Sequence, residues 1–197
     1  MNNLKVAIIG CGGIGSYFVR SLSEVIKKDI SGFTKLNPMG IDLIDFDLVE
    51  EKNLSYQNFD IEHIGSLKAE VLEEQTGFKA IEEEISEIHI DDLNEYDLIV
   101  LCVDNNEVRQ VVYNSGIKFL DLRASGKTFM AYLTEKGDKE YLDLTVDTGA
   151  KGGCQREEDL EDRHIQFGNR IIAEIGIQIL ADYLRGEIET KKIILTL

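Results

Sequence analysis

The sequence is poor in cysteine, in proline and in long apolar runs. Its three cysteines form no CxxC pair, which excludes a disulfide scaffold or a four-cysteine zinc site and indicates a reducing compartment, the cytoplasm. A single proline beside 17 glycines excludes a collagen-like or proline-rich chain. No apolar run approaches the roughly 20 residues that a membrane-spanning helix needs, and the N-terminus lacks the cleavage-site pattern of a signal peptide.

Basic residues are also scarce. The 21 Lys and Arg residues face 37 Asp and Glu residues, and the resulting net charge of −16 disfavours binding to nucleic acid or to an anionic membrane. The chain does have apolar residues, which make up 43% of its 197 positions and suffice for a substantial core. We therefore expect one domain that spans residues 1–197.

Short apolar runs alternate with amphipathic stretches along the chain. The apolar runs predict buried strands at residues 4–9, 41–46, 98–103 and 117–122, with a weaker candidate at 78–85. Helical spacing occurs at residues 16–28, 63–75, 106–114 and 165–184. This alternation predicts an α/β fold, a Rossmann-like and mostly parallel sheet with helices on both faces.

The C-terminal third predicts an antiparallel extension of this sheet. Residues 128–133 and 140–146 are expected to pair around a turn at 136–138, and residues 192–197 add a final strand. Residues 28–40 are expected to form a loop, and residues 147–163 a loop or a partly disordered segment.

The first strand ends in a glycine-rich turn, GCGGIG, which satisfies the pattern GxGxxG between a strand and a helix. Glycines let a phosphate chain approach the backbone, and the N-terminus of the next helix supplies N–H groups and partial positive charge. The pattern favours a phosphate or dinucleotide site. The alternative is a tight strand-to-helix turn that binds nothing.

Acidic residues follow the second strand in the segment LIDFDLVE. In dinucleotide-binding proteins one acidic residue at this place holds a ribose. Here Asp45 and Asp47 lie two residues apart and face the same side of an extended chain, with Glu50 shortly after them. One carboxylate suffices for a ribose, so the others have a second role or belong to an acidic loop.

Four motifs occur in a fixed order: GCGGIGS, LIDFDLVEEKNLSYQ, GSLKAEVL and VDNNEVR. Together they resemble the ThiF/MoeB/HesA superfamily, which includes the ubiquitin-activating enzymes. Its members use ATP and Mg²⁺ to adenylate the C-terminal glycine of a ubiquitin-like or sulfur-carrier protein. The resemblance extends from about Val6 to Arg109, and it implies this adenylyltransferase activity, these cofactors, a carrier protein that ends in Gly-Gly, and a homodimer.

The resemblance also implies roles for individual residues. It assigns the triphosphate to Gly10, Gly12, Gly13 and Gly15, the ribose to Asp45 with Asp47 beside it, the phosphates to Asn53, Gln57 and Lys68, and Mg²⁺ to Asp104 with Asn105 beside it. The catalytic set that it implies includes Asp104, Lys68 and Arg109.

The chemistry of these residue types agrees with the resemblance. A carboxylate that attacks a phosphate brings like charges together, so a cation is needed, and Mg²⁺ prefers one or two carboxylates plus phosphate oxygens. Asp104 follows the strand at 98–103, at the sheet edge where ligands bind, and Lys68 supplies a point charge. The alternatives are a solvated helix lysine for Lys68 and a helix N-cap for Asp104.

Three features depart from the superfamily pattern. The segment NLxRQ reads NLSYQ, so Tyr56 replaces an arginine; no N-terminal helix brings a second arginine to a neighbouring subunit; and the paired CxxC zinc motifs are absent. Arg20, Arg109 and Arg123 are candidate substitutes for the missing cations. The departures support a second hypothesis, a non-catalytic ATP-binding or scaffold protein of the same family.

Three residues near the C-terminus are also considered. Some relatives carry a thioester or persulfide cysteine after the core sheet, so Cys154 is a candidate catalytic nucleophile; otherwise it is a loop cysteine. Asn169 and Arg170 open the last helix; they are interpreted as a helix cap and a surface charge, with the alternative that they reach the site. A third hypothesis, a nicotinamide-dependent oxidoreductase, explains the glycine turn but requires neither a phosphate lysine nor a metal carboxylate.

Overall fold

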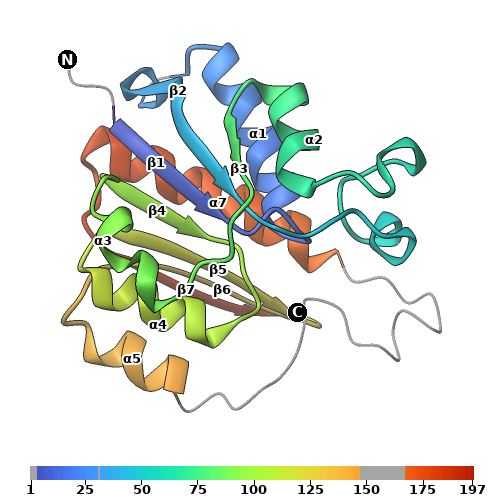
Figure 1. Ribbon diagram of the computed structural model, residues 1–197. Coiled ribbons are helices and arrows are strands. Elements are labelled where there is room, and N and C mark those ends of the chain that lie inside the picture. Colours follow the sequence, from blue (N-terminus) through green and yellow to red (C-terminus); the bar gives the residue numbers. More distant parts are fainter. Residues whose placement is uncertain (1–3, 31, 147–166) are drawn as a thin grey trace.

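The structure is a computed structural model that describes residues 4–30, 32–146 and 167–197. A seven-stranded sheet runs through the molecule, with helices on both of its faces (Figure 1). The strands are β1 (Leu4–Ile9), β2 (Leu36–Ile44), β3 (Lys79–Ile81), β4 (Leu98–Leu101), β5 (Phe119–Ser125), β6 (Thr128–Thr134) and β7 (Lys191–Thr196). The helices are α1 (Gly15–Lys27), α2 (Lys68–Thr76), α3 (Ile90–Leu93), α4 (Asn106–Ser115), α5 (Lys139–Val146) and α7 (Gly168–Arg185). Short 3-10 turns are η1 (Phe33–Lys35), η2 (Glu51–Ser55), η3 (Ile61–His63) and η4 (Glu87–His89).

The strand order is β3-β2-β1-β4-β5-β6-β7. The first five strands in this order are parallel, and β6 and β7 are antiparallel to their neighbours. In the sheet, β2 lies on one side of β1 and β4 lies on its other side. The direction in which the chain adds strands therefore reverses at β1. Ligands bind at such a point in open α/β sheets. The predicted fold class is confirmed.

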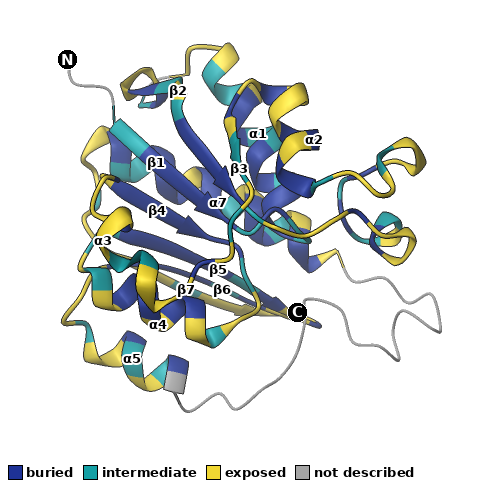
Figure 2. Cartoon of the chain, viewed as in Figure 1, coloured by how far each residue is buried: buried dark blue, intermediate teal, exposed yellow. Residues whose placement is uncertain are grey.

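The two faces of the sheet pack against different helices. In β1, Val6 and Ile8 belong to a core with α1, α2 and α7, whereas Ala7 and Ile9 belong to a core with α3, α4 and α5. This alternation follows from the two-residue period of a strand. Figure 2 shows the central strands β1 and β4 largely buried between the two helical layers. Among the described helices, none is both long and apolar enough to cross a membrane.

The start of β2 differs from the expectation. Residues 28–40 were expected to form a loop and the strand to begin at Ile41, but β2 begins at Leu36 and contains Pro38. Leu4 of β1 pairs with Leu36, but Val6 pairs with Ile41. The register of the two strands therefore shifts between Leu4 and Val6. Proline lacks an N–H and is tolerated at such irregular places in a strand, which explains why it does not mark a loop here.

The second predicted helix also begins later than expected. Residues 61–63 form the turn η3, and α2 starts only at Lys68. An antiparallel bridge between Leu48 and Leu67, and a hydrogen bond from the Val49 N–H to the Ser66 carbonyl at 2.9 Å, join this region to the segment after β2. The start of α2 is therefore fixed beside the residues that follow β2.

Residues 140–146 were expected to form a strand, and this expectation is wrong. They belong to α5, and β6 pairs with β5 and β7 instead. Tyr141 and Thr145, four residues apart, are both buried, as on one face of a helix. Asp138 begins the helix, because its Oδ1 accepts a hydrogen bond from the Tyr141 N–H at 3.1 Å.

The Asp138 cap generates a prediction about acid stability. Burial alone would raise the pKa of the Asp138 carboxyl, but hydrogen bonds from Thr134 and Tyr141 outweigh it and lower the pKa. A lowered folded-state pKa gives stability that is present above the unfolded pKa of about 3.9 and is lost as the pH falls through the folded value. Asp138→Ala should lower the free energy of unfolding by about 1 kcal/mol at neutral pH.

Urea unfolding over a range of pH measures this effect. Asp138→Asn is the matched control, because it keeps the capping oxygen but does not titrate. The stability difference between Asp138→Ala and the wild type should shrink below about pH 4, whereas the difference between Asp138→Ala and Asp138→Asn should not. A difference from the wild type that is independent of pH would contradict a capping carboxylate.

Candidate functional site

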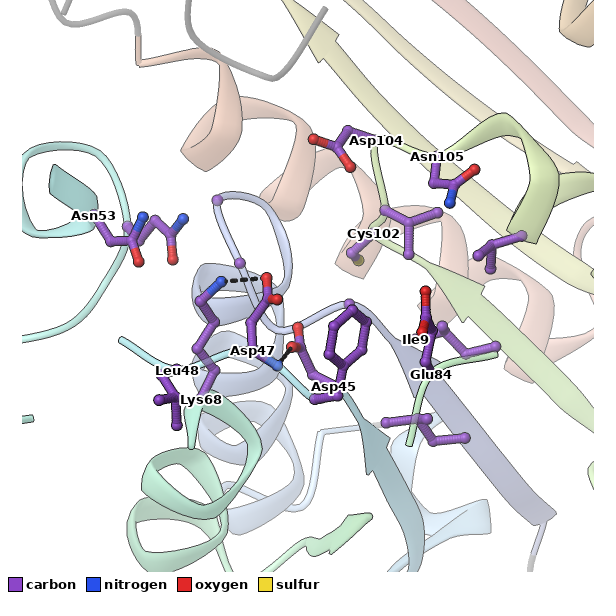
Figure 3. A pocket seen from close by; sticks show the side chains of 18 of the residues that line it. Ile9, Asp45, Asp47, Leu48, Asn53, Lys68, Glu84, Cys102, Asp104 and Asn105 are labelled. Carbon is purple, nitrogen blue, oxygen red and sulfur yellow. Dashed lines mark hydrogen bonds and ion pairs between the residues drawn. The ribbon is translucent and has the colours of Figure 1, made fainter. Parts of the chain in front are cut away.

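A cleft of about 560 Å³ opens where β1, β2 and β4 end (Figure 3). This volume lies within the range of small-molecule sites. The predicted residues that line it are Gly10, Gly12, Gly13, Asp45, Asp47, Asn53, Gln57, Lys68, Asp104 and Asn105. They come from four separate chain segments, which the parallel strands bring to one edge of the sheet.

The glycines of the turn after β1 have different tasks. Gly10 has φ +93°, and a Cβ there would lie 2.9 Å from the Cys102 carbonyl carbon. A Cβ on Gly15 would lie 1.9 Å from the Gly10 carbonyl oxygen, and Gly15 does not line the cleft. At Gly12, by contrast, the nearest atom, Gln57 Nε2, would be 3.7 Å away. The fold requires Gly10 and Gly15, and Gly12 leaves the wall of the cleft free for a ligand.

Asp45 holds this turn against the exit of β2. Its Oδ2 accepts the Cys11 N–H at 2.6 Å, and its Oδ1 accepts the Asp47 N–H at 2.8 Å. Burial raises the pKa of the Asp45 carboxyl, and these two hydrogen bonds reduce the rise. Burial and the nearby Asp45 also raise the pKa of the Cys11 thiol, which keeps that thiol protonated and unreactive. Each carboxylate oxygen of Asp45 has a second lone pair for a ligand hydroxyl.

Lys68 is a buried cation at the cleft. It is 5% exposed, and its Nζ lies 2.7 Å from Asp47 Oδ2. The Lys68 N–H also donates to the Asp47 carbonyl at 2.9 Å, so the first residue of α2 is fixed to the segment after β2. A solvated helix lysine is therefore not what the structure shows. The ammonium lies in the cleft wall beside a half-exposed carboxylate, where an anionic ligand can share it.

The segment after β2 contributes polar groups and a second cation. Asn53 Nδ2 donates to the Tyr56 hydroxyl at 3.2 Å, and Tyr56 lines the cleft. Lys52 also lines the cleft, where it pairs with Glu50. Sequence reasoning missed Lys52, although it precedes NLSYQ directly. Gln57 is buried, and its Oε1 has no hydrogen-bond partner in the described residues.

Asn169 approaches the same turn from α7. It is 1% exposed, and its Nδ2 would lie 2.5 Å from a Cβ on Gly13. Its Nδ2 donates to the Tyr56 carbonyl at 3.5 Å, and its Oδ1 lacks a partner among the described residues. Asn169 was interpreted as a helix cap, but it packs against the glycine turn. The packing of α7 against α1 brings it there, in line with the alternative that Asn169 reaches the site.

The turn after β4 separates the roles of two neighbouring residues. Asn105 is the N-cap of α4, because its Oδ1 accepts the Glu107 N–H at 2.7 Å. Asp104 is exposed at the cleft, and within the described residues its carboxylate makes no hydrogen bond or ion pair. Since the cap is Asn105, Asp104 remains available for a ligand or a metal ion.

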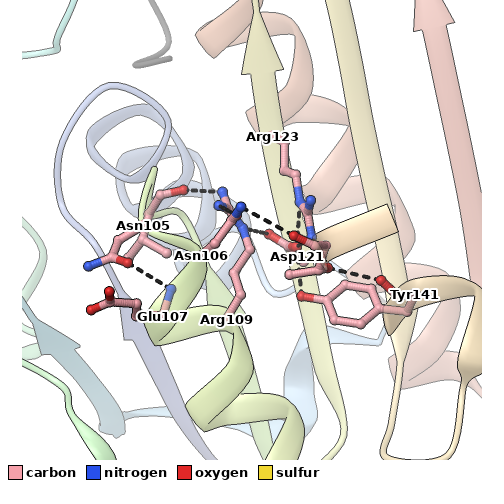
Figure 4. A network of polar contacts seen from close by, with 9 residues as sticks. Asn105, Asn106, Glu107, Arg109, Asp121, Arg123 and Tyr141 are labelled. Carbon is pink, nitrogen blue, oxygen red and sulfur yellow. Dashed lines mark hydrogen bonds and ion pairs between the residues drawn. The ribbon is translucent and has the colours of Figure 1, made fainter. Parts of the chain in front are cut away.

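The remaining candidates do not line the cleft. Arg109 is buried against Asp121, away from the cleft surface (Figure 4). Arg123 also pairs with Asp121, and Arg20 donates to Asn58 Oδ1 at 3.3 Å. Among the described residues, none of the three arginines named as candidate substitute cations lines the cleft, and a catalytic role for Arg109 stays a prediction. Cys154 lies outside the described residues.

These groups fit a Mg²⁺-bound nucleotide. One end of the cleft has a buried ammonium and a glycine wall without side chains, beside the Gln57 amide, whose oxygen has no partner within the described part of the chain. The carboxylate of Asp104 is the kind of oxygen ligand that Mg²⁺ prefers. Apolar side chains at the other end, Ile9, Phe46, Ile85 and Val108, offer a surface for a base.

Comparison with known proteins gives the family. The sequence model of the ThiF family matches residues 1–134, and the chain belongs to this family. Comparison with curated protein sequences gives no match. The resemblance read from the four motifs is thus confirmed.

Solved structures share the fold. Escherichia coli MccB with ATP is 20% identical, with a TM-score of 0.67, and the match covers 100% of this chain and 61% of MccB. The same protein with AMPCPP and selenomethionine MccA is 20% identical, with a TM-score of 0.65 and coverage of 99% and 61%. PaaA is 17% identical, with a TM-score of 0.68 and coverage of 98% and 61%. The chain thus spans about 61% of the length of these neighbours.

The glycine turn generates a paired prediction. Gly15→Ala should lower the free energy of unfolding by about 3 kcal/mol or prevent folding, because its Cβ collides with backbone that cannot move aside. Gly12→Ala should leave stability nearly unchanged, because its Cβ meets ordinary contacts. Chemical denaturation of both variants measures this. Equal losses in the two would refute the division of tasks between these glycines.

Proposed function

We propose that this chain is an ATP-dependent adenylyltransferase that activates the C-terminal carboxylate of a ubiquitin-like or sulfur-carrier protein. The observation that carries the proposal is the presence, in one cleft, of a buried ammonium and of a carboxylate that has no hydrogen-bond or ion-pair partner among the described residues. Lys68 lies at the start of α2, and Asp104 lies in the turn after β4. The glycine turn follows β1, which lies between β2 and β4 in the sheet. Family membership supports the same reaction.

Different residues bind different parts of the nucleotide. The backbone at Gly12 and Gly13 and the ammonium of Lys68 bind the phosphates. Asp45 accepts a hydrogen bond from the ribose, and Asp104 holds Mg²⁺. When bound, Mg²⁺ neutralises phosphate charge. A carboxylate oxygen of the carrier attacks the α-phosphorus, the bond from that phosphorus to the bridging oxygen breaks, and pyrophosphate leaves with the electron pair.

The partner and the assembly are further parts of the proposal. The carrier ends in Gly-Gly, as the family implies, and MccB, a structural neighbour, is crystallised with MccA as well as with ATP. The chain acts in the cytoplasm as a homodimer of single adenylation domains. Cys154 is a candidate nucleophile for a step that follows adenylation.

A second candidate function is a non-catalytic ATP-binding scaffold. The observation that favours it is Tyr56, a neutral phenol in the cleft where the family pattern has an arginine. A nicotinamide-dependent oxidoreductase is less favoured, because that cofactor uses neither the ammonium of Lys68 nor a metal at Asp104.

Calorimetry and pyrophosphate exchange test the leading proposal. The wild type should bind ATP with Mg²⁺ more tightly than NAD, and Lys68→Gln should weaken ATP binding because the buried positive charge is lost. Asp104→Asn should lower exchange by about 100-fold or more, since charge stabilisation by a metal ion contributes several kcal/mol. Synthetic peptides that end in a Gly-Gly carboxylate serve as acceptors, with the C-terminal amides as controls.

Two outcomes contradict this proposal in different ways. Tighter binding of NAD than of ATP with Mg²⁺ would refute the nucleotide assignment. Binding of ATP and Mg²⁺ without exchange for any acceptor would support the scaffold function instead. Melting temperatures of all variants show whether the fold is intact, and both substituted residues lie at the cleft, outside the two apolar cores.

Lys52 generates a further prediction. It is the second cation in the cleft wall, so it replaces the positive charge that Tyr56 does not provide. Lys52→Gln should lower pyrophosphate exchange by about tenfold or more, the loss expected when one charged contact to the leaving group is removed. Tyr56→Arg in the Lys52→Gln background should restore much of the rate. An unchanged rate in Lys52→Gln would show that its ammonium faces solvent and Glu50 only.

A further inference from the structure

A buried carboxylate lies below the turn that carries Asp104. Asp121, in β5, is 0% exposed. Its oxygens accept hydrogen bonds from Arg109 Nε at 3.3 Å, from Arg123 Nε at 2.7 Å and from the Tyr141 hydroxyl at 2.9 Å (Figure 4). Two guanidinium groups and one phenol therefore compensate a single buried charge, which explains how it is tolerated.

Arg109 extends this network to the cleft. Its Nη1 donates to Asn106 Oδ1 at 2.8 Å, and its Nη2 donates to the Val103 carbonyl. Val103 directly precedes Asp104, and Asn106 directly follows Asn105. One planar guanidinium thus holds the residues on both sides of the Asp104–Asn105 pair, while its Nε is fixed by Asp121.

The same turn is held from α5. Asn106 Nδ2 donates to the Thr145 carbonyl at 3.2 Å, and Arg123 Nη2 donates to Thr145 Oγ1 at 2.9 Å. Stability alone does not account for such a network, because well-packed apolar residues in place of a buried ion pair are often equally stable. A planar guanidinium with several fixed donors does, however, set the position of a backbone turn.

We infer that Arg109, fixed by Asp121, is a positioning residue that holds the Asp104 turn in the geometry needed for the metal ion. The inference rests on the proposed function, because it requires that Asp104 binds Mg²⁺. Arg109 itself is buried and is not among the residues that line the cleft, so it is not assigned a direct contact with the ligand. It acts through the Val103 carbonyl and the Asn106 side chain.

The test separates the metal-dependent part of ATP binding from the rest. The affinity for ATP is measured by calorimetry with saturating Mg²⁺ and with EDTA, and the ratio of the two affinities is the readout. Arg109→Lys keeps a positive charge beside Asp121 but cannot reach all three acceptors at once. It should lower the ratio about tenfold, the effect typical of groups that orient metal ligands, and leave the affinity in EDTA unchanged.

Tyr141→Phe is the matched control. It removes one hydrogen bond from Asp121 but leaves both arginines and the turn in place. It should lower the melting temperature and leave the ratio unchanged. Asn106→Ala removes the other side-chain partner of Arg109, so it should also lower the ratio, and it serves if Arg109→Lys fails to fold.

A double variant shows whether Arg109 acts through Asp104. Asp104→Asn alone should abolish most of the Mg²⁺ dependence, and Arg109→Lys added to it should cause no further loss. Additive losses, or equal weakening of ATP binding with Mg²⁺ and with EDTA, would show a general structural role and overturn the inference. If the wild type binds ATP without any enhancement by Mg²⁺, the metal assignment in the proposed function fails, and the inference fails with it.

Discussion

The Asp45 carboxylate joins two strand ends, and the geometry of the cleft depends on that contact. One oxygen holds the turn after β1 through Cys11, and the other holds the first residues after β2 through Asp47. Because the backbone of Asp47 also accepts from Lys68, the start of α2 is placed by the same contact. A glycine turn, a carboxylate and an ammonium thereby lie at fixed positions before any ligand arrives, which reduces the entropic cost of binding.

The sequence predicts the central sheet well, because its signal there is local. Residues 6–9 and 98–101 are continuous apolar runs, and the glycine turn follows the first of them as expected. The carboxyl-edge placement of Asp45 and Asp104 follows from parallel topology. Lys68 was predicted at the site, and the structure shows it in the cleft wall.

The sequence is least informative where distant contacts decide the outcome. Residues 140–146 have too short a pattern to distinguish a strand from a helix, and the Asp138 cap and the burial of Tyr141 decide for the helix. Arg109 carries a charge that suits a phosphate, but Asp121, on a neighbouring strand, draws it into the interior. Asn169 reaches the glycine turn only because α7 packs against α1. No local pattern in the sequence encodes such pairings.

The cleft wall joins segments that lie far apart along the chain, from the turn after β1 to the turn after β4. A nucleotide bound there would contact several segments that are distant in the sequence. Such a ligand stabilises the native state by mass action. Local opening of any one segment would have to release the ligand first. Occupancy of the cleft should therefore slow amide hydrogen exchange together in the strand ends that form it, and spare β7, at the far edge of the sheet.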